Sequence, residues 1–248
     1  MNRKTRSDLR ILLIQPRLDL PMVEHELLSI ARYSGLCKEQ LLSVNPFKNR
    51  IDEVLLEKAD AVIIGGSDTS VLDNFEWTES IASIVEKAVE SYLPVFGSCW
   101  GHQMIVKIFG GKVATDISRK EIGSINVKLT SSGMKDRLFR SLPQTFVAQS
   151  GHKDHVFYLP ECFEALADSE LSPYQGIKMR GYPVYGAQFH ADLGKSELIE
   201  RLSYYRYDYV SCTEFDNVCA NLRESPEALN ILSSFVDCVV LDHLKSSV

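Results

Sequence analysis

The first part of the chain alternates short apolar runs with longer amphipathic stretches, and this alternation constrains the fold more than any other feature of the sequence. Two stretches, residues 23–33 and 75–92, carry apolar residues at helical spacing. The apolar runs have the length of strands, and they occupy residues 9–14, 40–44, 59–64 and 94–96. This pattern predicts an α/β fold of the flavodoxin-like type, with a mostly parallel sheet and helices on both of its faces.

The middle of the chain, residues 112–163, changes to short strand-like runs separated by turns, at 125–129, 145–149 and 156–159. These runs predict antiparallel additions to the parallel sheet. Two further runs, 177–180 and 184–189, are separated by Gly181-Tyr-Pro183 and are expected to form a hairpin that returns to the core.

Beyond Gly194 the sequence has helical character to its end. Its strongest helical periodicity spans residues 229–244, and Pro226 suits the first position of that helix. No repeat, low-complexity segment or linker interrupts the chain. We therefore expect residues 1–248 to form a single domain, with a core at about 9–194 and a helical C-terminal extension at 195–248.

Composition excludes several classes of protein. Hydrophobic residues make up 45% and charged residues 24%, which is typical of a globular chain. The 27 basic and 33 acidic residues give a formal net charge of −6 without a basic cluster, so nucleic acid is not an expected partner. No apolar run is long enough to span a membrane and no cleavable leader is evident, which makes a cytoplasmic location the expectation.

The six cysteines are scattered and form no CxxC pair. This spacing argues against a zinc site, and in a cytoplasmic chain the thiols should stay reduced.

One cysteine has a special setting. Cys99 lies between Gly97 and Gly101, directly after a buried strand and before an amphipathic helix. This arrangement is the nucleophile-elbow pattern with cysteine in place of serine. The small neighbours permit a sharp turn that exposes the side chain above the sheet, and the positive end of the following helix favours a thiolate. The backbone N–H of Trp100 would point at the same reacting centre and could bind an oxyanion.

The alternative for any free cysteine is a structural role in the core, and this is the commonest role of free cysteines. The two glycines at a strand-to-helix turn favour a functional Cys99. The other five cysteines lack this setting and are interpreted as structural or incidental.

The segment Gly97-Ser-Cys-Trp-Gly-His-Gln103, followed by Gly110-Gly-Lys-Val113, resembles the Gly-x-Cys-x-Gly-x-Gln signature of class I glutamine amidotransferases. Three other segments resemble family motifs in the same order and spacing. They are Ile63-Ile-Gly-Gly-Ser67, Gln149-Ser-Gly-His-Lys-Asp154 and Gly186-Ala-Gln-Phe-His190. The second of these resembles the His-x-Asp segment of the stand-alone, GMP-synthetase-glutaminase-like members. Together the motifs extend the resemblance over about residues 9–194.

The resemblance implies a catalytic triad of Cys99, His190 and Asp192. His190 would serve as the base that takes the proton of Cys99. Asp192 stands where the family has Glu, and Ala191 replaces the family's Pro. A carboxylate at this place would orient the imidazole. The alternative is that Asp192 is a solvated loop acid or a helix cap, which would leave a Cys99–His190 dyad.

The resemblance also implies residues that bind the substrate. Gly66 would supply a second oxyanion N–H beside that of Trp100, although Ser67 stands where many relatives have Pro. Gln103 would contact the α-carboxylate or α-amino group of a glutamine-like substrate, or else face solvent. His152 and Asp154 are expected to support the site without taking part in catalysis.

The expected activity is hydrolysis of the γ-amide of glutamine, or of a γ-glutamyl compound, through a cysteinyl thioester without a metal or other cofactor. Three alternatives remain open. The chain could be a glutaminase subunit that passes ammonia to a separate synthetase, since it has no ATP-binding motif of its own. It could instead be a γ-glutamyl peptidase that acts alone, or a catalytically weak binding or regulatory module. Its expected ligand is a small molecule, and a homodimer is the assembly left open.

Overall fold

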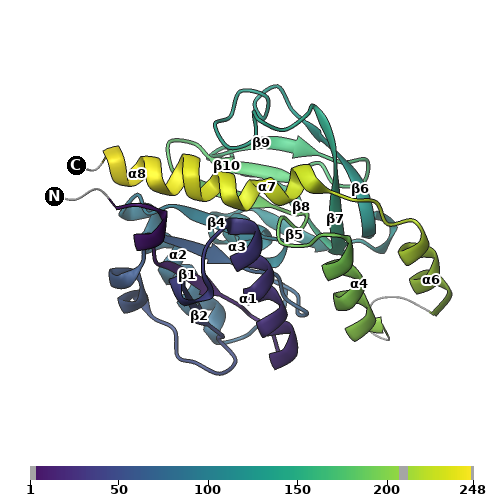
Figure 1. The fold of residues 1–248 in the computed structure, drawn as a ribbon, viewed down its shortest axis with the longest axis horizontal. Coiled ribbons are helices and arrows are strands. Elements are labelled where there is room, and N and C mark those ends of the chain that lie inside the picture. Colours follow the sequence, from purple (N-terminus) through teal and green to yellow (C-terminus); the bar gives the residue numbers. More distant parts are fainter. Residues whose placement is uncertain (1–3, 207–211, 247–248) are drawn as a thin grey trace.

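The computed structural model describes residues 4–206 and 212–246, and it contains a nine-stranded sheet with helices on both faces (Figure 1). The strand order in this sheet is β2-β1-β3-β4-β11-β10-β9-β6-β7. The strands of the first half are β1 (Ile11–Ile14), β2 (Leu41–Val44), β3 (Ala61–Ile64) and β4 (Val95–Ser98). The later strands of the sheet are β6 (Glu121–Leu129), β7 (Thr145–His152), β9 (Phe163–Asp168), β10 (Gly176–Met179) and β11 (Val184–Ala187).

The two halves of the sheet differ in direction. β2, β1, β3, β4 and β11 are joined by parallel pairs, whereas the pairs that lead from β11 through β10, β9 and β6 to β7 are antiparallel. The expected flavodoxin-like sheet is confirmed, since the order 2-1-3-4 is that of flavodoxin-like folds. The expected hairpin is also confirmed, because Gly176 pairs with Ala187. A separate two-stranded sheet joins β5 (Lys112–Thr115) to β8 (Asp154–Tyr158).

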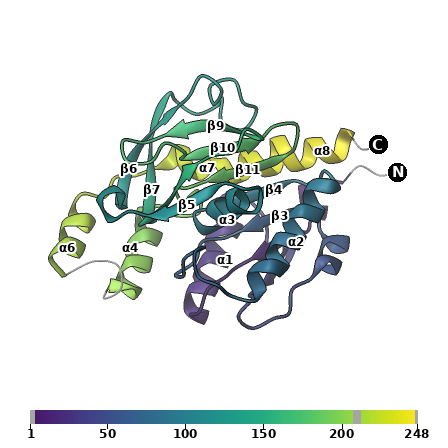
Figure 2. The same ribbon diagram turned by 180° about the vertical axis from the view of Figure 1, so that it is seen from behind.

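The helices form two layers over the sheet, as the two opposite views show (Figures 1 and 2). α1 (Leu20–Ser34) and α7 (Pro226–Ser234) pack against each other on one face. α2 (Trp77–Glu90) and α3 (Trp100–Ile108) cover the other face. The remaining helices are α4 (Lys195–Tyr204), α6 (Cys212–Ala220) and α8 (Leu241–Ser246). Within the described ranges, no helix is both long and apolar enough to cross a membrane.

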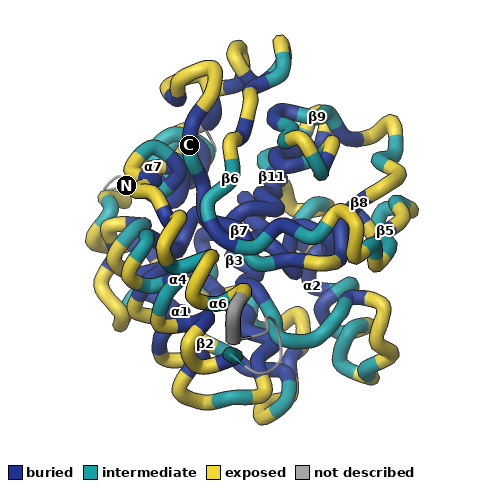
Figure 3. The backbone as a smooth tube through the Cα atoms, turned by 90° about the vertical axis from the view of Figure 1, so that its right-hand side faces the viewer, coloured by how far each residue is buried: buried dark blue, intermediate teal, exposed yellow. Residues whose placement is uncertain are grey.

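Successive side chains of a buried strand point to opposite faces of the sheet, and β1 shows this directly. Ile11 and Leu13 join the core beneath α1 and α7, whereas Leu12 and Ile14 join the core beneath α2 and α3. Figure 3 shows the strands as a buried layer between more exposed helices. This strand is apolar at every position because both of its faces are covered by helices.

The structure differs from the sequence-based expectation at three places. β9 was not expected, because Glu164-Ala-Leu-Ala167 consists of good helix formers; its pairing with β10 and β6 makes it a strand. β5 was not expected either. The predicted C-terminal helix is interrupted by a π-helical segment, Phe235–Val240, between α7 and α8.

α3 begins unusually close to the sheet, and Gly101 makes this approach feasible. Its N–H donates to the carbonyl oxygen of Gly65 at 3.1 Å. A Cβ atom built at residue 101 would lie 2.3 Å from the carbonyl oxygen of Ile64. That oxygen belongs to the backbone of β3 and cannot rotate away, so the first turn of α3 needs a residue without a side chain.

We expect Gly101→Ala to destabilise the protein by roughly 1–3 kcal/mol, the usual cost of overpacking a tight interior. Urea unfolding at neutral pH would measure the loss. The matched control is Gly151→Ala, because a Cβ atom at residue 151 would meet nothing within 4 Å. Equal stability of the two variants would show that α3 can move away from β3 without cost.

Candidate active site

Cys99 occupies the turn between β4 and α3 in a strained backbone conformation. Its φ is 50° and its ψ is −100°, and a positive φ is rare for a residue with a side chain. Its N–H donates to the carbonyl oxygen of Ala187 at 2.8 Å, which ties the turn to the end of β11. The elbow geometry expected from the sequence is therefore present, with the cysteine at the carboxyl end of a strand inside the sheet.

His190 reaches Cys99 from the segment that follows β11. Its backbone N–H donates to the carbonyl oxygen of Gln149, at an isolated bridge with β7. Its Nδ1 donates to Oδ1 of Asp192 at 3.0 Å. This bond leaves Nε2 for the Cys99 thiol, and Cys99 and His190 line the same small hollow. The structure thus brings together the three residues of the expected triad.

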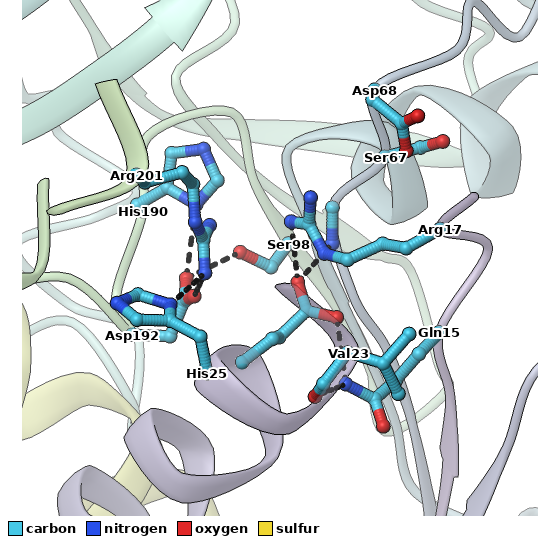
Figure 4. A network of polar contacts seen from close by, with 12 residues as sticks. Gln15, Arg17, Val23, His25, Ser67, Asp68, Ser98, His190, Asp192 and Arg201 are labelled. Carbon is cyan, nitrogen blue, oxygen red and sulfur yellow. Dashed lines mark hydrogen bonds and ion pairs between the residues drawn. The ribbon is translucent and has the colours of Figure 1, made fainter. Parts of the chain in front are cut away.

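Asp192 is shorter than the glutamate of the family motif, yet its carboxylate contacts the imidazole directly. The carboxylate is buried and has two further partners. Ser98 Oγ donates to its Oδ1 at 3.2 Å, and Arg201 Nη2 approaches its Oδ2 at 3.4 Å. Figure 4 shows Asp192 between His190 and Arg201. The alternative of a solvated loop acid is therefore wrong for this side chain.

The charges of the site shift the pKa values of the His190–Asp192 pair. Burial opposes the charged imidazolium, but the negative charges of Asp192 and Cys99 outweigh burial and raise the pKa of His190 to about 9. Burial likewise opposes the Asp192 carboxylate, while His190 and Arg201 together hold its pKa well below the ordinary value. Both effects favour an imidazolium–carboxylate pair at neutral pH.

This shift predicts a pH-dependent contribution of His190 to stability. An imidazole with an ordinary pKa of 6.5 in the unfolded chain and about 9 in the folded chain stabilises the fold fully below pH 6.5. That stabilisation is lost as the pH rises to about 9. Urea unfolding of wild type and His190→Gln across this range should therefore give a difference in unfolding free energy that shrinks with rising pH. A difference that stays constant would contradict the raised pKa.

The two expected oxyanion donors differ in this structure. Among the described residues, none accepts a hydrogen bond from the Trp100 N–H, which is at the start of α3. The Gly66 N–H, by contrast, donates to Oε1 of Glu26 at 3.0 Å. Gly66 does lie beside the imidazole, since a Cβ atom there would be 3.2 Å from His190 Cε1. Its N–H can bind an oxyanion only after Glu26 releases it.

Glu26 is held over the Gly66 loop by a buried polar network. Arg17 Nη2 donates to Glu26 Oε1 at 2.8 Å, and Gln15 Nε2 donates to Glu26 Oε2 at 3.0 Å. Burial opposes the guanidinium charge, but Glu26 raises the pKa of Arg17 above its usual range. Separating Glu26 from Arg17 would leave a buried charge without its partner, which is costly. Glu26 is therefore firmly positioned.

A cavity of about 540 Å³ opens in front of the thiol. Its wall includes Cys99, Trp100 and Gln103 together with polar residues of the loop 67–70 and of residues 151–154, where β7 ends and β8 begins. Acidic and basic groups face the cavity, among them Asp68 and Lys120. This lining suits a small zwitterion with an amide at one end. Cys99 also lines a smaller hollow of about 30 Å³ on the side of His190, Arg17 and Arg201.

Gln103 is buried rather than facing solvent, so that alternative is wrong. Its Nε2 donates to the backbone carbonyl oxygen of Asp154 at 2.8 Å and to Oε1 of Gln188 at 3.0 Å. Both N–H bonds of its amide are thus engaged inside the protein, and only Oε1 remains for a ligand in the cavity.

His152 and Asp154 line the cavity and also have contacts within the protein. His152 pairs with Glu121 at 3.1 Å, and Asp154 accepts hydrogen bonds from Ser70 and Thr115. His102 is completely buried, and this burial lowers its pKa to about 3, so its ring stays neutral.

Sequence reasoning missed the buried charges around the triad. Glu26 was detectable, because it stands four residues from both Met22 and Ile30 on the apolar face of α1. Arg201 similarly stands between Leu198 and Leu202 on the buried face of α4. A charged residue on an apolar stripe signals a buried polar contact. Arg17 has no such signal.

The described cysteines, residues 37, 99, 162, 219 and 238, are free thiols. The side chain of Cys212 lies outside the described residues.

Comparison with known proteins agrees with this geometry. Residues 26–198 match the family model of glutamine amidotransferase class-I. The chain is 33% identical over 154 residues to a glutamine-hydrolyzing GMP synthase subunit of Methanococcus maripaludis, covering 61% of this chain and 75% of the relative. It is 29% identical over 173 residues to the protein of the same name from Pyrococcus abyssi, covering 70% and 85%.

Solved structures share the fold at lower sequence identity. A glutamine amidotransferase from Thermotoga maritima superposes with a TM-score of 0.74 at 21% identity, over 93% of this chain and 98% of that one. A glutamine amidotransferase from Methylobacillus flagellatus gives a TM-score of 0.69 at 16% identity, over 96% and 92%. The strained cysteine turn, the four collinear motifs and the match over residues 26–198 lead to one conclusion. The chain belongs to the class I glutamine amidotransferase family.

Proposed function

We propose that this chain hydrolyses the γ-amide of glutamine through a thioester on Cys99, with His190 as the base and Asp192 as the residue that orients it. The observation that carries this proposal is the His190–Asp192 hydrogen bond beside Cys99, which lines both the polar cavity and the hollow next to His190. The membership of the family supports the substrate class.

In the first half-reaction Cys99 reacts as the thiolate, with the proton it has given up held on Nε2 of His190. The thiolate then adds to the amide carbon, and the carbonyl oxygen becomes an oxyanion. The free N–H of Trp100 is placed to stabilise this charge, because it stands at the start of α3 next to the nucleophile. When the C–N bond breaks, His190 returns its proton to the departing ammonia.

In the second half-reaction water attacks the γ-glutamyl thioester and gives its proton to His190. The C–S bond breaks, the electron pair returns to sulfur, and glutamate leaves. Asp192 keeps Nδ1 of His190 protonated throughout, so that Nε2 always faces the reacting atoms. Gly66 joins the oxyanion site if the arriving substrate displaces Glu26 from its N–H.

We further propose that the ammonia is used by a separate chain. The relatives reported above are named as subunits of a glutamine-hydrolyzing GMP synthase. The proposal is tested by measuring ammonia release from glutamine by the purified chain, alone and with its candidate synthetase partner. In parallel, a small panel of γ-glutamyl amides tests the release of amines. Preference for that panel would favour a γ-glutamyl peptidase, and no release under any condition would contradict a hydrolase.

Replacing the nucleophile gives the most direct prediction. Cys99→Ser should abolish glutamine hydrolysis and leave the thermal unfolding midpoint nearly unchanged, because serine is similar in size and the elbow is held by the backbone. A glutamine analogue with an alkylating group should label Cys99 first. The exposed Cys37 and Cys162 serve as internal controls in the mass spectrum. Labelling of another cysteine first, or hydrolysis by Cys99→Ser, would refute the assignment.

Asp192→Asn should lower turnover roughly 10- to 1000-fold. In a serine triad the corresponding change costs about 10⁴, and a cysteine depends less on the acid because its thiol ionises more readily. The matched control is Asp216→Asn, on α6, outside the residues that line the cavity. Steady-state kinetics with glutamine would measure both. Turnover equal to wild type in Asp192→Asn would reduce the triad to a Cys99–His190 dyad.

A further inference from the structure

The side chain of Gln188 contacts the nucleophile, and the mechanism above gives it no task. Its Nε2 lies 3.8 Å from Cys99 Sγ, which is hydrogen-bonding distance for sulfur. Gln188 follows β11 and is completely buried. A buried N–H directed at a thiolate stabilises its charge, whereas a carbonyl oxygen at the same place would repel it. The effect on sulfur therefore depends on which end of the amide faces it.

The neighbouring contacts determine this orientation. The backbone carbonyl oxygen of Asp154 can only accept a hydrogen bond, so Gln103 must present its NH₂ group there. The second N–H of that NH₂ group points to Gln188, which must present its oxygen, at 3.0 Å. The NH₂ group of Gln188 then has to face Cys99. Because Gln188 is completely inaccessible to solvent, water does not replace its partners.

We propose that Gln188 is a catalytic residue that stabilises the Cys99 thiolate, and that Gln103 is a positioning residue that sets the orientation of the Gln188 amide from the Asp154 carbonyl. This inference rests on the proposed function of Cys99 as the nucleophile. Gln103 acts through Gln188 with its two N–H bonds and retains only its oxygen for the substrate.

The donor is useful at two points of the reaction. It stabilises the negative sulfur after the proton has moved to His190, which raises the fraction of reactive thiolate. It stabilises the same charge again when the C–S bond of the thioester breaks and the electron pair returns to sulfur. In the thioester itself the sulfur is neutral and a weak acceptor, so the bond contributes little there. Gln188 thus favours both the formation and the breakdown of the acyl-enzyme.

The test is the rate of Cys99 alkylation by iodoacetamide as a function of pH, which needs no substrate. Gln188→Met keeps the length of the side chain and removes the donor. At neutral pH its alkylation should be about 5- to 20-fold slower than that of wild type, as expected for the loss of a charge-assisted hydrogen bond. The midpoint of the pH profile should move to higher pH, and the plateau at high pH should remain. The matched control is Gln144→Met, because Gln144 is exposed and should leave the profile unchanged.

Gln103→Met tests the positioning step. It frees the Gln188 amide to rotate, so the midpoint should move in the same direction by a smaller amount. The double variant Gln103→Met/Gln188→Met should be no slower than Gln188→Met alone, because Gln103 acts only through Gln188. Gln103→Met also keeps the proposal testable if Gln188→Met does not fold, which circular dichroism would show.

An unchanged midpoint in a folded Gln188→Met protein would overturn the proposal while leaving Cys99 as the nucleophile. If Gln188→Met does not fold, an unchanged midpoint in Gln103→Met would overturn it. A lower plateau without a shift of the midpoint would indicate altered access to the sulfur and would also overturn it. Failure of the proposed function has a different signature, which is hydrolysis that survives Cys99→Ser.

Discussion

The turn between β4 and α3 is the constraint on which the rest of the site depends. Cys99 adopts a positive φ there, and such a conformation costs of order 1–3 kcal/mol for a residue with a side chain. The surrounding packing must offset this cost. The hydrogen bonds of Cys99 to Ala187 and of Gly101 to Gly65 hold the turn against two neighbouring segments of the sheet. The sulfur is consequently fixed where the chain after β11 delivers His190.

Buried charge is the second determinant of the site. Asp192, Arg201, Arg17 and Glu26 are all nearly inaccessible to solvent, and each is paired with an opposite charge. Because these groups are removed from water, their interactions are stronger than surface ion pairs, and they keep His190 in one orientation. Glu26 is also bonded to the loop after β3, because it accepts the N–H of Gly66. In this structure the N–H of Gly66 therefore has a partner within the protein itself.

Sequence patterns predicted the parallel half of the sheet well, because its strands are covered on both faces and appear as continuous apolar runs. They predicted the antiparallel half less well. β9 has the composition of a helix and becomes a strand only because β10 and β6 provide hydrogen-bonding partners on both sides. Strand propensity depends on such neighbours more than on the residues themselves, and neighbours distant in the chain cannot be deduced from local periodicity.

By itself, the sequence determined which chemistry is available: a cysteine between two glycines at a strand-to-helix turn, and a His-x-Asp segment after a later strand. These features are local, so their spacing alone identifies them. Only the tertiary structure decided which partners meet. It showed that Asp192 reaches His190 despite its shorter side chain, that Glu26 occupies Gly66, and that Gln188 faces the sulfur. The last two contacts join segments that are distant in the sequence, and the first depends on the backbone conformation after β11, so local periodicity encodes none of them.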